Sequence, residues 1–329
     1  MPNPHSLRGF RRGRLTWLSA VGHRAALVLL LVFARAAFAQ EQGGLLWTAV
    51  APGKPTLFLV PTMHTLVEDS EPLNRTLEAY MGRASALALE LPLRPRSQQD
   101  IETYLKHALY VDDDTLLRHI APGDESFFKK CAADAGVPFE KFARAKPWFN
   151  AFHIYALPTR GAITYAGIDV RLANIAQAQK KPVLYLESPG EQAMELDGIP
   201  KENQISMLMY ACQILDASSA NDTLRTDERG WLLQVQRAWQ AGDAMTLGRL
   251  ADSPIPGQPP ELFDVSRYIY RDGTDRFVHG LSQAGFSGTS GPILVAVGFG
   301  HFFGAASLPE RLKKAGYTVT GPVVDVQSQ

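Results

Sequence analysis

Four residues of metal-ligating type follow apolar, strand-like runs in this chain of 329 residues: His64, Glu90, Glu187 and His301. In an open α/β sheet, ligands bind beyond the carboxyl ends of the strands. Imidazole and carboxylate groups bind divalent metal ions. We therefore expect a metal site with His64, His301 and Glu90 as ligands and Glu187 beside them. Taken singly, each residue has a structural alternative, such as a helix cap for His64 or an arginine ion pair for Glu90.

Strands near the start of the chain must position the first of these residues. Residues 45–50 and 56–60 are strand-like runs on either side of a turn with Pro and Gly, which predicts a hairpin. Apolar spacing predicts a helix from about Ser70, and an apolar strand follows at residues 84–91. A strand, a helix and a second strand in this order favour a parallel unit with a right-handed crossover.

The middle of the chain is predicted to be mainly helical, and strands return toward its end. Apolar spacing indicates helices near residues 101–109, 126–135, 172–179 and 190–250, and strands at 163–169 and 183–187. The last predicted elements are a strand at 293–297, a helix at 308–315 and a strand at 317–324. These patterns predict a mixed α/β (α+β) fold. Its central, mostly parallel sheet is built from both ends of the chain, and its middle is helical.

The first 39 residues have the three parts of a cleavable export signal. Six arginines and no acidic residue precede Glu41, residues 25–34 form an apolar core, and Ala37 and Ala39 frame a cleavage site. The apolar core is short for a membrane span, which takes about 20 apolar residues. We therefore expect cleavage after Ala39 rather than an uncleaved membrane anchor. The mature domain would be residues 40–329, periplasmic or secreted, with membrane contact only during export.

Composition after this cleavage argues against nucleic acid as a partner. Residues 40–329 keep 27 of the 33 basic residues and all 33 acidic ones, so the net charge is −6, and no basic run stands out. A hydrophobic content of 46% is enough for a large core. The two cysteines are Cys131 and Cys212. They could pair in an oxidising compartment, or be separate buried apolar side chains.

Short motifs in a characteristic order run through nearly all of the mature chain. They resemble the TraB/PrgY/GumN family, and above all its bacterial GumN-like branch; the family includes the animal Tiki proteases. The matching segments are residues 45–64 with their Trp strand, turn and P-T-M-H, the strand ending in Glu90, Lys146-Pro147-Trp148, Gly167-Ile168-Asp169, residues 186–192, Ala238-Trp239 to Asp243, and V-G-F-G-H-F-F-G at residues 297–304.

The resemblance implies a fold related to erythromycin esterase and to the haem-binding ChaN proteins, together with metal-dependent hydrolysis. It places His64, His301 and Glu90 at the metal, which would be Mn²⁺, Co²⁺ or Zn²⁺. It also implies that Arg271 holds substrate or stabilises an oxyanion. The family's Arg-Asn pair is Arg271-Asp272 in this chain, a departure at the second position.

We therefore expect an exported, metal-dependent hydrolase that acts on amide bonds of a peptide or small-molecule substrate. Glu90 or Glu187 would be the general base. Two alternatives are a non-enzymatic envelope protein that binds haem or a metal, and an accessory factor in exopolysaccharide production.

Pro61 is a second departure, because the family's first motif begins with Gly. Gly permits positive φ, whereas Pro restricts φ and has no N–H group. We expect the fold to survive, since Pro can close a strand without breaking a central ladder. We also expect lower activity, because a missing N–H could remove a donor from the site.

Overall fold

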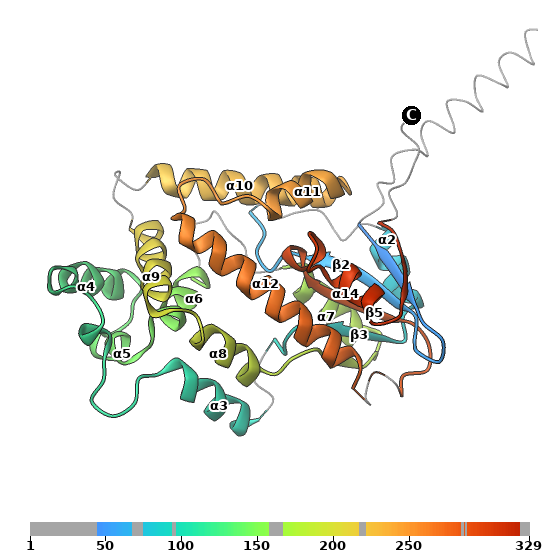
Figure 1. Ribbon diagram of the computed structural model, residues 1–329, viewed down its shortest axis with the longest axis horizontal. Helices are drawn as coiled ribbons and strands as arrows, with labels where there is room; N and C mark the ends of the chain where they lie inside the picture. The colour runs from blue at the N-terminus through green and yellow to red at the C-terminus, as the bar shows by residue number, and fades with distance from the viewer. Residues whose placement is uncertain are drawn as a thin grey trace, which may run out of the picture. The chain divides into compact units, whose positions relative to one another are not determined.

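A computed structural model describes residues 45–67, 75–93, 97–157, 167–216, 222–283, 286 and 288–322, so the expected export signal lies outside the described residues. Figure 1 shows the arrangement of the elements. In chain order they are β1 (Trp47–Val50), β2 (Leu57–Thr62), α2 (Arg75–Arg83), β3 (Ala86–Leu89), α3 (Gln98–Ala108), η1 (Leu116–Arg118), η2 (Pro122–Asp124), α4 (Glu125–Asp134), α5 (Phe139–Arg144), α6 (Pro147–Tyr155), α7 (Ile168–Ala178), β4 (Val183–Tyr185), α8 (Pro189–Asp197), α9 (Lys201–Leu215), α10 (Asp222–Gln240), α11 (Ala244–Ala251), α12 (Pro260–Leu281), β5 (Ile293–Gly298), η4 (Phe299–Phe302), α14 (Leu308–Lys314) and β6 (Thr318–Thr320).

The strands form one mixed sheet in the order β4-β3-β5-β2-β1-β6. The pairs β4–β3, β3–β5 and β5–β2 are parallel, whereas β2–β1 and β1–β6 are antiparallel. The predicted hairpin is confirmed, with Trp47 opposite Leu59. The sheet is therefore mostly parallel and built largely from the two ends of the chain, as predicted; of the described strands, β4 alone comes from the helical middle.

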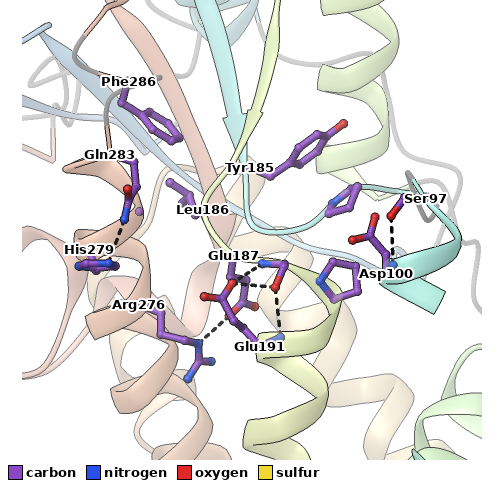
Figure 2. Close-up of a pocket in the computed structure, with 14 residues that line it drawn as sticks. Ser97, Asp100, Tyr185, Leu186, Glu187, Glu191, Arg276, His279, Gln283 and Phe286 are labelled. Carbon is purple, nitrogen blue, oxygen red and sulfur yellow. Dashed lines mark hydrogen bonds and ion pairs between the residues drawn. The ribbon is translucent and has the colours of Figure 1, made fainter. Parts of the chain in front are cut away.

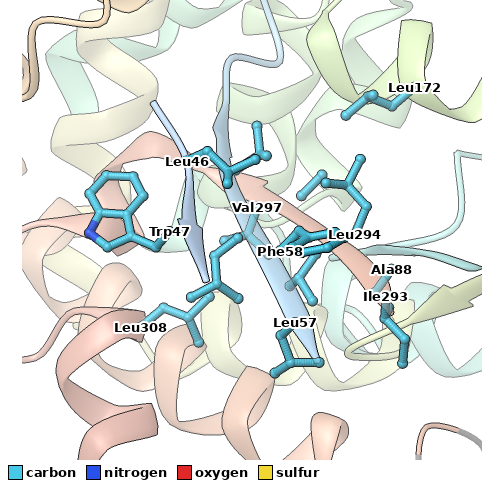
Figure 3. Close-up of a cluster of buried hydrophobic side chains, with 14 of the residues drawn as sticks. Leu46, Trp47, Leu57, Phe58, Ala88, Leu172, Ile293, Leu294, Val297 and Leu308 are labelled. Carbon is cyan, nitrogen blue, oxygen red and sulfur yellow. The ribbon is translucent and has the colours of Figure 1, made fainter. Parts of the chain in front are cut away.

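The central strands are apolar along their whole length because both faces of the sheet are covered. All residues of β2 and β3 are buried, and so are residues 293–297 of β5. Leu57 and Phe58 of β2 lie beside Ile293 and Leu294 of β5, with Leu172 of α7 and Leu308 of α14 nearby (Figure 3). Strands buried on both sides appear in the sequence as continuous apolar runs. Such runs made these strands predictable without knowledge of their partners.

A second core holds the helical middle together, and α12 belongs to both cores. Leu262 and Val265, early in α12, pack with the side chains of α4, α6 and α9. Phe277 and Leu281, late in the same helix, pack against the sheet. Figure 1 shows α12 running from the helices α4 to α9 toward the sheet. The middle of α12 therefore lies where the two cores meet.

Cys131 of α4 and Cys212 of α9 form a disulfide, with Cα atoms 5.4 Å apart. They are 81 residues apart in the sequence, so the bond links distant parts of the helical core. The sequence left open whether the two cysteines pair or are separate buried side chains. In the structure they are bonded to each other.

The prediction for residues 163–169 is wrong where it can be checked. Gly167 caps α7, and Ile168 and Asp169 are its first residues, so they are helical rather than extended. The rest of that segment, and the predicted helix start at Ser70, lie outside the described residues. Among the described helices, none is both long and apolar enough to span a membrane.

Candidate functional site

Three neighbouring strands end at the same edge of the sheet, and each is followed by a candidate site residue. Glu90 follows β3, His64 lies just beyond β2, and Gly298 ends β5 ahead of His301 in η4. Because β3, β5 and β2 are adjacent and parallel, their carboxyl ends lie side by side. The sheet thereby gathers residues that are more than 200 positions apart in the chain.

The side chains of His64, Glu90 and His301 surround Gly298. His64 Nε2 lies 3.5 Å from Glu90 Oε2, and the Gly298 N–H donates to Glu90 Oε1. A methyl group on Gly298 would lie 3.2 Å from Glu90 Oε1, 3.5 Å from His64 Nε2 and 3.7 Å from His301 Cδ2. One point is thus within contact distance of all three side chains.

Asp169 fixes the other side of His64. Its Oδ2 lies 3.4 Å from His64 Nδ1, and the Ile168 N–H donates to the Met63 carbonyl at 2.9 Å. A Cβ on Gly167 would come within 2.5 Å of the His64 carbonyl oxygen, so only glycine permits this approach. The segment at residues 167–169 therefore packs directly against the first histidine.

His301 is held through its Nδ1 atom by α12. That atom lies 2.9 Å from Thr274 Oγ1 and 3.2 Å from the Tyr270 carbonyl oxygen. Since the Thr274 hydroxyl donates to the same carbonyl at 2.5 Å, the Nδ1–H of His301 is the donor to both oxygens. This tautomer leaves the lone pair on Nε2.

Charge at this group is set by burial and by the two flanking carboxylates. Burial of the ring edge acts to lower the pKa of His64, whose side chain is still 58% exposed, but Glu90 and Asp169 outweigh it and raise that pKa well above its ordinary value. Burial acts to raise the pKa of Glu90, but His64 and the Gly298 N–H bring it to about 2. Burial lowers the pKa of His301. His64 and Glu90 therefore form an imidazolium–carboxylate pair, and His301 beside them is a neutral imidazole.

The donor types and their outer partners fit a divalent metal ion. Metal-binding histidines donate their second ring N–H to an oxygen acceptor, and His64 and His301 both direct Nδ1 toward one. No three His, Cys, Asp or Glu side chains in the described part of the chain are already arranged to hold an ion. Both oxygens of Glu90 are engaged, Oε2 by His64 and Oε1 by the Gly298 N–H. Ligation of a metal ion through Nε2 would require His64 to give up the proton that it shares with Glu90.

A cavity of about 340 Å³ adjoins this group and holds Glu187 as well. The side chain of Glu187 is only 3% exposed, and burial raises its pKa to about 7 against the opposing effect of Arg276. Arg276 Nε donates to Glu187 Oε2 at 2.7 Å, and its Nη2 donates to Glu195. One arginine thus pairs with two buried carboxyl groups in the wall of the cavity, and its single positive charge can offset only one negative charge.

The ion pair of Glu187 and Arg276 also lines a second hollow, of about 710 Å³. Figure 2 shows this hollow, with Arg276 reaching Glu187 from α12, and with Ser97 and Asp100 on the opposite side. Glu187 and Arg276 line both the cavity and the second hollow. Their ion pair therefore forms part of the wall between the two spaces.

Arg271 lies outside the group of residues around the cavity. Its side chain is 56% exposed, and its Nε donates to Asp272 Oδ1 at 2.7 Å. The cavity is lined by Ile269, Tyr270, Gly273, Arg276 and Phe277, which repeat at helical spacing on one face of α12. Position 271 is on another face, so the arginine at the cavity is Arg276.

Sequence reasoning missed Asp169, Arg276 and Glu195 as site residues. Asp169 carried a signal, because it belongs to a motif already recognised at residues 167–169. Arg276 and Glu195 carried none, since their importance depends on the packing of α12 against α8.

Pro61 lies inside β2, opposite Val297 of β5, and not after the end of the strand as predicted. Its carbonyl accepts a hydrogen bond from Trp239 Nε1 at 2.7 Å, so it points away from β5. The N and C=O of a strand residue point to the same side, and β1 begins opposite Leu59. The proline therefore breaks no ladder bond, and its missing N–H faces Trp239 rather than the site.

The Pro61→Gly variant should keep the rate of the parent to within about twofold and be about 1–2 kcal/mol less stable. The loss comes from the greater freedom of glycine in the unfolded chain. Steady-state kinetics and urea unfolding would measure both quantities. The lower activity expected from the sequence assumed a donor aimed into the site; a several-fold faster rate in Pro61→Gly would show that the missing N–H of Pro61 matters to the reaction.

Comparison with known proteins gives one match. The sequence matches the TraB/PrgY/gumN family over residues 45–321, which is most of the chain and includes every residue of the group around Gly298. No curated protein and no solved structure matches it.

Proposed function

Since the chain belongs to the TraB/PrgY/gumN family, we propose that it is an exported, metal-dependent hydrolase of amide bonds. The observation that carries the proposal is the convergence of His64, Glu90 and His301 on the space beside Gly298, next to a cavity of about 340 Å³. Family membership alone does not specify an activity. We also propose the fold relation to erythromycin esterase and ChaN, which a solved structure of this chain would test.

His64, His301 and Glu90 would hold the ion, Mn²⁺, Co²⁺ or Zn²⁺, which when bound supplies a Lewis acid for the substrate carbonyl and a water of lowered pKa. Glu187 is the residue suited to be general base. Its pKa of about 7 lets Oε1, the oxygen that Arg276 Nε does not bond, accept and return a proton near neutral pH. Glu90, with a pKa of about 2, is a much weaker base. Arg276 orients the Glu187 carboxylate.

Two observations support the proposed export to the periplasm or beyond. The Cys131–Cys212 disulfide is typical of proteins from oxidising compartments. The arginine-rich, apolar start of the chain has the pattern of a secretory signal.

The test uses purified residues 40–329, stripped with chelator and titrated with Mn²⁺, Co²⁺ or Zn²⁺, then screened against peptides and esters. We expect stoichiometric metal binding and metal-dependent hydrolysis. Glu90→Gln should lower both the metal affinity and kcat/KM by about 10²-fold or more, because it removes a ligand charge. Glu102→Gln, on the exposed α3 surface, is the matched control and should have neither effect.

Each outcome separates the proposal from its rivals. Colourless protein with one bound metal and a hydrolysed substrate supports the hydrolase. A Soret absorption band in the purified protein would favour the haem-binding alternative instead. Metal-independent activity, or full activity in Glu90→Gln, would contradict the assignment of this site.

A further inference from the structure

The cavity that contains the candidate site is also lined by Glu228 of α10 and Tyr210 of α9. Neither residue has a part in the hydrolysis proposed above. Both come from the helical layer rather than from the sheet edge that carries His64 and Glu90. They therefore raise a separate question, which is what kind of group this part of the cavity accepts.

Glu228 differs from the other carboxylates of the cavity because no described residue supplies it with a counter-charge. Glu90 is paired with His64, and Glu187 and Glu195 share Arg276. Within the described ranges, no hydrogen bond or ion pair to the Glu228 carboxylate is found. Its pKa is raised to about 7 by burial alone. A partly buried acid without a partner is costly, and a cationic ligand would remove that cost.

Tyr210 is an independent sign of a missing partner in the same place. Its side chain is 1% exposed, and its hydroxyl has no hydrogen-bond partner among the described residues. Burial raises its pKa, and so do the charges of Glu228 and Asp227; the phenol and the Glu228 carboxylate line the same cavity. Leaving a buried polar group unsatisfied costs about 1–3 kcal/mol, so a ligand that bonds to this hydroxyl would be stabilised.

Apolar side chains make up much of the rest of the lining and suit a chain of methylene groups. They are Leu196, Met207, Ile255, Leu262, Val265 and Ile269, and the polar side chains of Tyr155, Gln192, Gln258 and Ser266 line the cavity beside them. A ligand for this part of the cavity therefore needs an apolar stem and a polar tip. An alkylammonium group has both, and its three N–H donors match a carboxylate and a phenol oxygen.

We propose that Glu228 and Tyr210 form an amine-binding subsite, which selects ligands with an alkylammonium group on an apolar stem. The ammonium donates to the Glu228 carboxylate and to Tyr210 Oη, while the methylene groups lie along the apolar walls. A lysine side chain of a peptide and a free aliphatic amine share this chemistry. Where the ligand is a peptide substrate, the inference rests on the proposed hydrolase, whose specificity the subsite would set.

The test measures binding of hexylamine and its uncharged analogue hexanol to purified residues 40–329 by calorimetry at pH 7.5, without added metal. We expect hexylamine to bind at least 10-fold more tightly than hexanol. Glu228→Gln should abolish this preference, and Tyr210→Phe should reduce it. Glu202→Gln, an exposed change of the same kind on α9, should leave it intact. Thermal unfolding checks that every variant is folded.

Two results would overturn the subsite: equal or undetectable binding of the two probes by the parent, or an amine preference that survives Glu228→Gln. A second arm compares N-acetyl-lysine methylamide and its norleucine analogue with cadaverine, and so identifies the source of the amine. These measurements need no turnover. An amine preference without hydrolysis would therefore contradict the proposed function but support the subsite. Hydrolysis without an amine preference would support the proposed function and contradict the subsite.

Discussion

Replacing Gly298 by alanine should lower kcat/KM of the proposed hydrolysis by about 10²-fold while leaving the fold intact. The new methyl group would lie 3.2 Å from Glu90 Oε1, so this carboxylate must shift by a few tenths of an ångström, and 3.5 Å from His64 Nε2, which is an ordinary contact. The methyl group also fills the space between the ligands, and a misplacement of reacting groups by about 1 Å can cost about 10²-fold in rate. Metal affinity should fall as well, because the methyl group occupies the space between the ligands.

Stability should change little in this variant. Gly298 has φ −52° and ψ 140°, values that alanine adopts without strain, so the unfolding free energy should stay within about 1 kcal/mol of the parent. Gly230→Ala is the matched control, because a Cβ there meets nothing within 4 Å. If Gly298→Ala kept the metal affinity and rate of the parent, the reaction would not take place beside Gly298.

The second large effect is on stability, and it concerns Arg276. Arg276→Met should lower the unfolding free energy by about 3–5 kcal/mol at pH 8, because it leaves the buried carboxylates of Glu187 and Glu195 without a counter-charge. Arg271→Met, on the same helix, removes an exposed ion pair with Asp272 and should cost far less, because solvent screens that pair. Urea unfolding of both variants gives the comparison directly. Equal losses would show that the pairing of Arg276 with the two glutamates contributes little.

The loss in Arg276→Met should shrink as the pH falls. The pKa of Glu187 in the folded protein is about 7, above its ordinary value of 4.5. The folded state therefore binds more protons than the unfolded state between these values, so Glu187 favours folding below about pH 4.5, and this contribution is lost as the pH rises through 7. Without Arg276 the carboxyl holds its proton more tightly, and at pH 5 it is buried uncharged. Unfolding curves at pH 5 and pH 8 would measure the difference; an equal loss at both would contradict it.

Local patterns in the sequence were sufficient for the sheet and for three members of the site. The strands at residues 57–62, 86–89 and 293–298 are buried on both faces, so their apolar runs are visible without knowledge of the partners. Parallel strands that neighbour one another end at one edge, and this placed His64, Glu90 and His301 together. The spacing of apolar residues likewise predicted most of the helices.

Only the tertiary structure decided which helix faces complete the site. Arg271 and Arg276 are five residues apart on one helix, and nothing in their composition says which of them meets Glu187; the packing of α12 against both cores turns Arg276 inward. The same holds for Asp169 beside His64, for the Cys131–Cys212 bond and for the presence of Glu228 and Tyr210 in one cavity. A strand end is defined by local sequence, whereas these contacts join segments whose rotation and distance are set by burial of the whole chain.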